Sequence, residues 1–226
     1  MSYHFEPKGP VGRFVNSLEE NTIAILLGLM TILTFVNVIL RYIFHSSLIW
    51  GLELTLALFA WMVLLGISHA VKINAHLGVD AVINILPAPA RKALALLAGG
   101  LCIFYAMLLL KGAWDYWAPF AGFKQTGGRW FPLGFIETRD RAFYVTEQIP
   151  MPGFLAWMGD VFNMAEPYEK LPRLIPYFVL PLGMALLLFR LLQATWMVWT
   201  GERASLIVSH EAEDAVEDVR HLNQGN

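Results

Sequence analysis

The residues best suited to chemistry are four ionisable side chains inside apolar stretches. Glu53 is the only acid in "IWGLELTLALFAWMVLLGISHAV", and Arg41, His69 and Arg190 lie in similar surroundings. A carboxylate at the centre of a membrane helix costs about 2.5 to 3.5 kcal/mol, so it is rare there without a partner or a task. The chemistry to consider is proton coupling in a transporter, ligation of a haem, or pairing between helices.

Glu53 lies about one and a half turns from the start of its apolar segment. Transporter sites lie near the bilayer midplane, so this depth argues against proton coupling. On the preceding segment, Met30, Thr34, Asn37 and Arg41 share a helical face. A short turn would bring Arg41 to the depth of Glu53, where a guanidinium can bind a carboxylate through two hydrogen bonds. We therefore expect Glu53 to pair with Arg41 or to contact a partner subunit.

Two further side chains leave alternatives open. Arg190, in "LLLFRLLQATW", either extends to the nearer headgroups or contacts a partner protein or a bound phospholipid. His69 is the only histidine in an expected span, because His45 and His76 fall in loops. A membrane haem needs axial ligands, commonly two histidines, so we expect His69 instead to hydrogen-bond a neighbouring helix or the interface.

These side chains are carried by four apolar stretches, each long enough to cross about 30 Å of hydrocarbon at 1.5 Å per residue. The expected spans are 21–44, 48–71, 93–117 and 174–199. On the second span, small residues share a face with Glu53, and small residues favour close helix packing in lipid. This face, expected to be turned to protein, contains Glu53, Ala57, Ala60, Leu64 and Ser68, and the opposite face contains Leu54, Leu58, Trp61 and Leu65.

The composition agrees with a membrane protein and excludes several other classes. The 226 residues are 57% hydrophobic and 15% charged, with a mean hydropathy of +0.53, whereas soluble domains are about a quarter charged. The net charge of -2 gives no basic surface for nucleic acid. Cys102 is the only cysteine, which excludes an intramolecular disulfide and a CxxC redox pair.

The expected organisation has four parts. They are a cytoplasmic segment 1–20, a four-helix membrane domain 21–199, a long periplasmic connection 118–173 within it, and an acidic cytoplasmic tail 200–226. Lys72, Arg91 and Lys92 in the shorter loop favour the cytoplasm for that loop and for both termini. The connection also carries six basic residues, but charges in long connections weigh less in setting orientation.

The connection also predicts secondary structure at the membrane surface. "RDRAFYVTEQI" and "PGFLAWMGDVFNMAEPY" are each expected to form a short amphipathic helix. In the second segment, Phe154, Trp157, Met158 and Val161 fall on one helical face, as in a helix that lies on a membrane or a partner. The expected fold class is therefore an all-α membrane protein with four transmembrane helices and short amphipathic interfacial helices.

An ordered set of short motifs resembles a known family. "VNVILRYIF" is followed by "IWGLELTLALFAWMVLLGISHAV", then by "NAHLGVD" and by "LP" before a basic pair. This order and spacing is similar to the small membrane subunit, Q-type or DctQ-like, of tripartite ATP-independent periplasmic (TRAP) transporters. The positions that match are Arg41, Trp50, Glu53, Trp61, Gly66, His76, Asp80 and Pro87. Leu52 departs from the family, which often has a second acid there, and the connection 118–173 is longer than in compact members.

The resemblance implies a division of labour in the bacterial inner membrane. A periplasmic binding protein captures an organic anion, a large membrane subunit holds the substrate and sodium sites, and the small subunit is a static scaffold. The long form resembles systems for C4-dicarboxylates such as succinate, malate or fumarate. The chain is then no enzyme and has no cofactor or metal of its own. Its partners would be the large subunit, the binding protein and phospholipid.

The candidate intramembrane and subunit-interface residues are Arg41, Trp50, Glu53, Trp61, His76, Asp80 and Arg190. Two other functions remain possible from the sequence. One is a stand-alone proton-coupled small transporter that uses Glu53, and the other is a membrane anchor of a redox enzyme that uses His69. The sequence has no internal repeat and no polar group expected at the midplane, which favours the scaffold.

Overall fold

The computed structural model describes residues 9–73, 87–132, 134–136, 144–163 and 166–201, and most of these are helical. Four helices are long and apolar enough to cross a membrane. They are α1 (Gly9–Ile43), α2 (Gly51–Ile73), α4 (Ala88–Trp117) and α7 (Val179–Thr200), the last preceded by the short α6 (Leu174–Tyr177). The expected four-helix membrane fold is thus confirmed.

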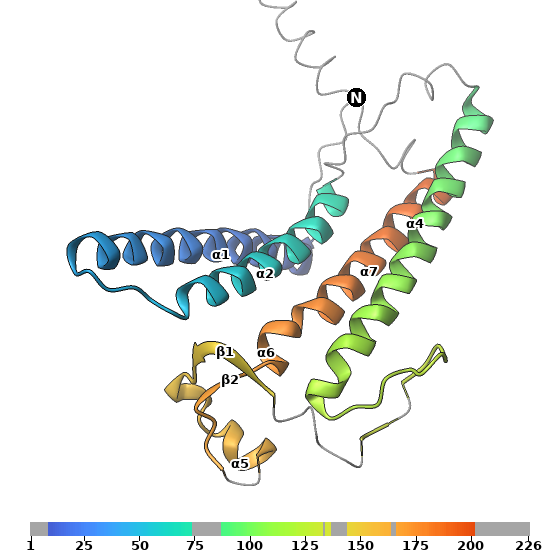
Figure 1. The fold of residues 1–226 in the computed structure, drawn as a ribbon. Helices are drawn as coiled ribbons and strands as arrows, with labels where there is room; N and C mark the ends of the chain where they lie inside the picture. The colour runs from blue at the N-terminus through green and yellow to red at the C-terminus, as the bar shows by residue number, and fades with distance from the viewer. Residues whose placement is uncertain (1–8, 74–86, 133, 137–143, 164–165, 202–226) are drawn as a thin grey trace, which may run out of the picture.

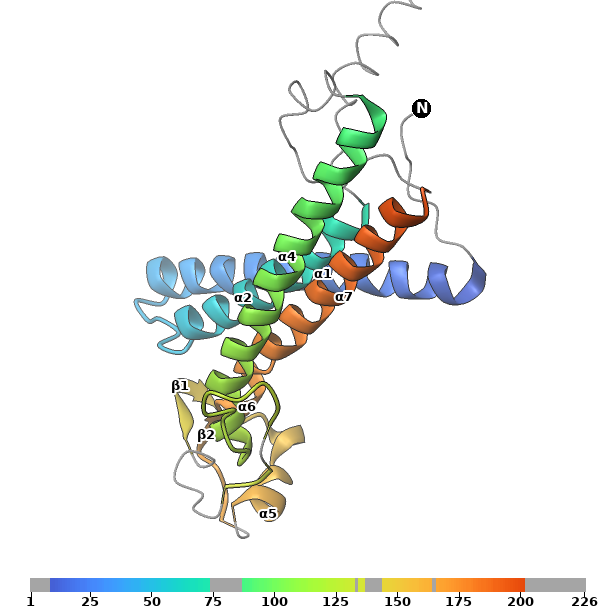
Figure 2. The same ribbon diagram turned by 90° about the vertical axis from the view of Figure 1, so that its right-hand side faces the viewer.

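The long helices form two antiparallel hairpins, α1 with α2 and α4 with α7 (Figure 1). The hairpins meet where α2 packs along α7, and α7 in turn packs along α4. In both views α1 is inclined to α4 and α7; it projects to one side of them in Figure 1 and crosses behind them in Figure 2. The chain therefore leaves long stretches of α1 and α4 open for lipid or for another protein.

Two helices begin earlier than the apolar composition predicts. α1 begins at Gly9 although residues up to 20 were expected to precede the span, and α4 begins at Ala88. The first turns of α1 are helical although they carry polar side chains. One of these side chains, Glu19, is bound by residues of α2 and α7. α4 starts after Pro87, with Pro89 in its first turn, where a missing N–H is tolerated.

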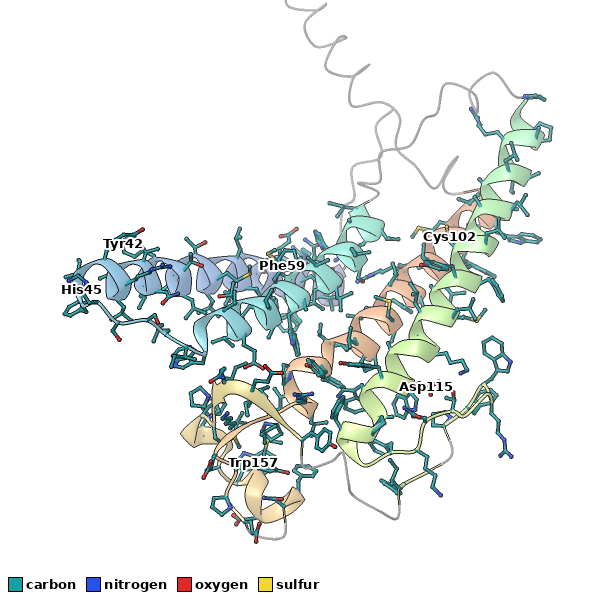
Figure 3. All side chains as sticks on the ribbon, in the orientation of Figure 1. Tyr42, His45, Phe59, Cys102, Asp115 and Trp157 are labelled. Atoms are coloured by element: carbon teal, nitrogen blue, oxygen red, sulfur yellow. The ribbon has the colours of Figure 1, made fainter. Side chains whose placement is uncertain are left out.

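The turn between α1 and α2 is closed by hydrogen bonds rather than by a glycine. The Asn37 side-chain oxygen accepts the Leu48 N–H at 3.0 Å, and the Ser46 N–H donates to the Leu40 carbonyl at 3.0 Å. His45 adopts a left-handed conformation with a φ of 49°, which a residue with a Cβ adopts less readily than glycine. The turn forms the far end of the first hairpin, where Figure 3 labels Tyr42 and His45.

The connection between α4 and α6 folds below the ends of these helices (Figure 1). Its elements are η1 (Ala118–Ala121), β1 (Val145–Pro150), η2 (Gly153–Leu155), α5 (Met158–Phe162) and β2 (Lys170–Pro172). β1 and β2 pair antiparallel, with Val145 opposite Pro172 and Pro150 opposite Lys170. A small sheet therefore joins the middle of the connection to its end.

The expected amphipathic helix in "RDRAFYVTEQI" is wrong in its described part, because Val145–Pro150 is the strand β1. Residues 139–143 of that segment lie outside the described residues. The strand forms because its backbone pairs with β2, and the Arg173 N–H adds a bond to the Tyr144 carbonyl at 3.0 Å. Pairing between segments so far apart in sequence overrides a local helical pattern.

The second expected amphipathic segment does form short helices, η2 and α5. Its apolar face is divided, however. Met158 is buried, whereas Phe154, Trp157 and Val161 are exposed. These three side chains therefore remain available at the surface of the connection. The loop 74–86 and the tail 202–226, including His76 and Asp80, lie outside the described residues.

Candidate functional site

A cluster of charged side chains joins three of the four long helices. Glu19 of α1 accepts hydrogen bonds at Oε2 from Lys72 Nζ of α2 at 2.8 Å and at Oε1 from Arg190 Nη2 of α7 at 2.5 Å. His69 Nδ1 of α2 lies 3.2 Å from Glu19 Oε2. The cluster is enclosed, since the Lys72 and Arg190 side chains are only 4% and 10% exposed.

The Glu19 cluster holds two basic side chains, Lys72 and Arg190, against one carboxylate. Removal of one partner from such a buried group leaves the others charged and unsatisfied, which is strongly destabilising. The two helix hairpins meet here, because Glu19 and Lys72 belong to the first hairpin and Arg190 to the second. The cluster can therefore fix the position of one hairpin relative to the other.

The cluster bears on two sequence expectations, and one residue was missed. Arg190 binds Glu19 and also Gln193 Oε1 at 3.1 Å, both within this chain; a contact of Arg190 with a partner protein or a phospholipid stays a prediction. The expected hydrogen bond of His69 to a neighbouring helix is confirmed. Glu19 was assigned to the segment before the first span. The available signal was an acid within one turn of an apolar run, with one cation at the end of the second span and another within the fourth.

Glu53 ties the start of α2 to the connection. Its Oε1 accepts the Glu147 N–H at 3.0 Å and its Oε2 accepts the Gln148 N–H at 2.7 Å, both from β1. Two neighbouring backbone donors of a strand edge are thus satisfied by one carboxylate. Glu53 thus connects a membrane helix to the sheet, a contact that we call the Glu53 clamp. The expected ion pair between Glu53 and Arg41 does not form, although both residues are described.

Arg41 lies in the last turn of α1, at the end of the first hairpin. Its side chain is exposed and takes part in no ion pair among the described residues. Large apolar side chains surround it in the sequence and are also exposed, namely Tyr42, Ile43, Phe44 and Ile49. The structure therefore brings Arg41 to a surface and not to Glu53.

The two tryptophans of the resemblance have different surroundings. Trp50 is half-buried in the turn before α2. Trp61 Nε1 donates to the Pro176 carbonyl of α6 at 3.0 Å, so this side of α2 contacts protein as well. The bulky face that contains Trp61 is therefore not simply a lipid face. His76 and Asp80 lie in the part of the chain that the structure does not describe.

Close packing of α2 on α7 agrees with the small-residue face expected on α2. A Cβ atom on Gly183 of α7 would lie 2.7 Å from the Leu64 Cβ of α2. Ser68, one turn further along the same face of α2, is buried. Glycine at position 183 is therefore needed for the approach of the two hairpins.

The other end of the helices is held by Asp115 and by a group of aromatic rings. The Asp115 carboxylate accepts the Thr126 N–H at 2.6 Å, the Thr126 hydroxyl at 2.8 Å and Lys111 Nζ at 3.0 Å. Trp117 Nε1 donates to the Leu174 carbonyl at 2.9 Å. The rings in mutual contact are Trp114, Trp117, Phe120, Phe123, Tyr116, Tyr177 and Phe178. Aromatic rings of this kind concentrate at membrane interfaces.

The geometry supports a part for these carboxylates in holding the chain together. Glu19, Glu53 and Asp115 each bind donors from other segments of the chain, which fixes the helices and the connection. Within the described residues, no group of three or more His, Cys, Asp or Glu side chains could hold a metal ion.

Comparison with known proteins gives the family. A family model for the DctQ component of tripartite ATP-independent periplasmic transporters matches residues 30–136. The C4-dicarboxylate TRAP transporter small permease protein DctQ of Vibrio cholerae serotype O1 is 46% identical over 220 residues, which are 96% of this chain and 88% of that protein. The chain belongs to the DctQ family. It is thus a small permease subunit of a TRAP transporter, a homologue of C4-dicarboxylate DctQ proteins, and not an enzyme.

Two other relatives show how the family varies. The DctQ protein of Rhodobacter capsulatus is 27% identical over 180 residues, which are 79% of this chain and 60% of that protein. The sialic acid TRAP transporter permease protein SiaT of Haemophilus influenzae is 35% identical over 80 residues, which are 35% of this chain but only 13% of that permease. As a TRAP component, a multi-pass membrane protein of this family has a large permease and a periplasmic binding protein as partners. Membership of the DctQ family also excludes the alternative function as a membrane anchor of a redox enzyme.

Proposed function

We propose that this chain is the static scaffold subunit of a C4-dicarboxylate TRAP transporter in the bacterial inner membrane. It supports a large sodium-coupled permease subunit, which receives the anion from a periplasmic binding protein. The observation that carries the proposal is the 46% identity, over 96% of the chain, to a small permease protein of a C4-dicarboxylate system. The small share of the SiaT permease that the chain matches supports a division between this unit and a much larger one.

The arrangement of the charged groups supports a scaffold more than a carrier. A group that carries a proton or an ion has to be free to bind and release it. Glu53 instead accepts two backbone N–H groups of β1, and Glu19 is held by Lys72 and Arg190. Release of either carboxylate would separate segments of the chain, which agrees with a static role.

The orientation that we propose has both termini in the cytoplasm and the connection 118–173 in the periplasm. Lys72, Arg91 and Lys92 lie at the ends of α2 and α4 that share a side with the end of α7, where Lys92 Nζ donates to the Trp199 carbonyl at 2.8 Å. The opposite side carries the sheet and exposed rings, namely Trp130, Phe131, Phe135, Phe154 and Trp157. This surface would meet the large subunit or the binding protein, and the remaining apolar surfaces would meet phospholipid.

Uptake of radiolabelled succinate into liposomes tests the proposed function. One set of liposomes contains this chain alone, a second contains the chain with the large subunit, and binding protein and a sodium gradient are supplied to both. We expect uptake only in the second set. Succinate uptake by the chain alone would contradict the scaffold role. Uptake of sialic acid but not of succinate by the complete system would contradict the substrate class.

A further inference from the structure

One face of α4 is exposed along its whole length. Its residues recur every three or four positions and are Leu94, Leu97, Leu101, Tyr105, Leu108, Gly112 and Tyr116. We call this surface the Tyr105 face. Ala106 is buried on the side of α4 that packs along α7. The Tyr105 face therefore points away from the rest of this chain.

Tyr105 lies deep in the membrane-spanning part of α4. Lys92 marks one end, where its Nζ binds the Trp199 carbonyl, and Tyr116 marks the other, within the group of aromatic rings. Along the helix axis Tyr105 is roughly 20 Å from Lys92 and 17 Å from Tyr116 at 1.5 Å per residue. Long helical side chains lean toward the N-terminus. The phenol oxygen is therefore directed from Tyr105 toward the middle of the hydrocarbon layer.

The Tyr105 hydroxyl has no hydrogen-bond partner among the described residues, and Tyr105 is 63% exposed. In lipid neither acyl chains nor water can supply one at this depth, and an unsatisfied polar group there is unfavourable. A tyrosine hydroxyl stands at the far end of a rigid ring and cannot return to the backbone of its own helix. Its partner has to come from another molecule.

The exposed polar groups of α1 provide a contrast. Thr31 Oγ1 donates to the Leu27 carbonyl at 2.9 Å, and Thr34 Oγ1 donates to the Met30 carbonyl at 2.8 Å. These hydroxyls are satisfied within their own helix, so this part of α1 is compatible with lipid. The Tyr105 hydroxyl has no such hydrogen bond to its own helix.

We propose that the Tyr105 face is the surface on which the large membrane subunit packs, an inference that rests on the proposed function. A helix of that subunit would supply a hydrogen-bond partner to Tyr105 near the midplane, where a periplasmic protein cannot reach. Leu101 and Leu108 would pack on either side of the bond. Gly112 meets no other atom within 4 Å of its ideal Cβ position, so a partner helix can approach closely there.

Site-specific photo-crosslinking tests this surface in the complex. Benzoylphenylalanine replaces Leu101, or Ile25 of α1 as a control, and the chain is co-expressed with the tagged large permease subunit of the same bacterium. The two side chains are matched in exposure at 62% and 61%. We expect a crosslink to the large subunit from position 101 and not from position 25. A crosslink from position 25 alone, or from position 101 only to lipid or to a second copy of this chain, would overturn the proposal.

The hydroxyl itself is tested by Tyr105→Phe, with Tyr42→Phe as the matched control at the end of the first hairpin (Figure 3). We expect Tyr105→Phe to speed dissociation of the large subunit about three- to tenfold in detergent, because one hydrogen bond in the interface is lost. Tyr42→Phe should leave the rate unchanged. Equal rates for Tyr105→Phe and the unmodified chain would contradict the hydrogen bond. Failure of the unmodified chain to recover any large subunit would instead contradict the proposed function.

Discussion

Glu19 is the residue whose loss should disturb the fold most. Its replacement by alanine leaves Lys72 and Arg190 buried with like charge and without their shared carboxylate. We expect Glu19→Ala to destabilise the purified chain by about 3 to 5 kcal/mol, the range found when one partner of a buried ion pair is removed. Thermal unfolding in detergent, followed by size-exclusion chromatography, measures the change.

The control for this prediction is the neighbouring acid. Glu20 is exposed and only accepts a hydrogen bond from Asn16 Nδ2, so Glu20→Ala should change the stability by less than about 0.5 kcal/mol. The double variant Glu19→Leu with Arg190→Leu should be more stable than Glu19→Ala, since the buried Arg190 charge is removed together with the carboxylate that it binds. Equal loss of stability in Glu19→Ala and Glu20→Ala would refute the role of the cluster.

Glu53 gives a prediction that is local to β1. Glutamine has one acceptor oxygen in place of two, so Glu53→Gln can satisfy only one of the Glu147 and Gln148 N–H groups. We expect amide hydrogen exchange at one of these two positions to become about tenfold faster, because one of the two hydrogen bonds is lost. Glu169→Gln, an exposed acid of the same connection, is the control. Unchanged amide exchange at both positions in Glu53→Gln would contradict the proposed contact between Glu53 and β1.

For single residues, the sequence predicts which side chains make structural contacts better than it predicts their partners. Apolar surroundings correctly single out His69 and Arg190 as residues that need polar contacts. The pairing of Glu53 with Arg41 was wrong, because backbone donors of a strand 94 residues away carry no signal in side-chain type. Glu19 was missed because it precedes the apolar run, whereas the helix that carries it begins ten residues earlier, at Gly9.

Among the helices, the contact of α2 with α7 is the most sensitive to added volume. A Cβ on Gly183 would lie 2.7 Å from the Leu64 Cβ and 3.6 Å from its backbone carbon, so α7 has to move. We expect Gly183→Ala to destabilise the chain by about 1 to 3 kcal/mol, as in other overpacked interiors. Thermal unfolding in detergent is again the measurement.

A glycine without such a neighbour provides the control for Gly183. Gly28 of α1 has nothing within 4 Å of its ideal Cβ position. Gly28→Ala should be neutral or should stabilise by up to about 1 kcal/mol, because alanine favours a helix more than glycine does. If Gly183→Ala were as well tolerated as Gly28→Ala, the close approach of α2 and α7 would be disproved.

The elements themselves are predictable to different degrees. Length and apolar composition are enough for the four long helices, since each has to satisfy its backbone alone in lipid. β1 could not be predicted, because its hydrogen bonds go to β2, to Glu53 and to Arg173, all distant in sequence. Met158 likewise turns inward by tertiary packing, away from the apolar face that its spacing predicts.

At the scale of the whole molecule, polar contacts hold the helices and the connection together, and long helix surfaces stay open. The Glu19 cluster joins the first hairpin to the middle of α7, and the Glu53 and Asp115 contacts join the connection to the helices. The sides of α1 and α4 carry exposed apolar residues. Such a unit is held together by its own polar contacts and offers long surfaces to a neighbour, as the proposed scaffold role requires.

The proposed orientation leads to a prediction about the connection. With both termini in the cytoplasm, the two-hairpin topology places 118–173 in the periplasm, because α4 crosses the membrane once between the basic loop and the connection. Gln125 is exposed and lies beyond the aromatic end of α4, where its Nε2 donates to the Asp115 carbonyl. In a Cys102→Ser chain, Gln125→Cys should react in intact cells with a membrane-impermeant thiol reagent. Gly201→Cys, at the end of α7, should react only after the inner membrane is opened. The reverse pattern of labelling would invert the topology, and it would place the sheet and its exposed rings on the side that a periplasmic binding protein cannot reach.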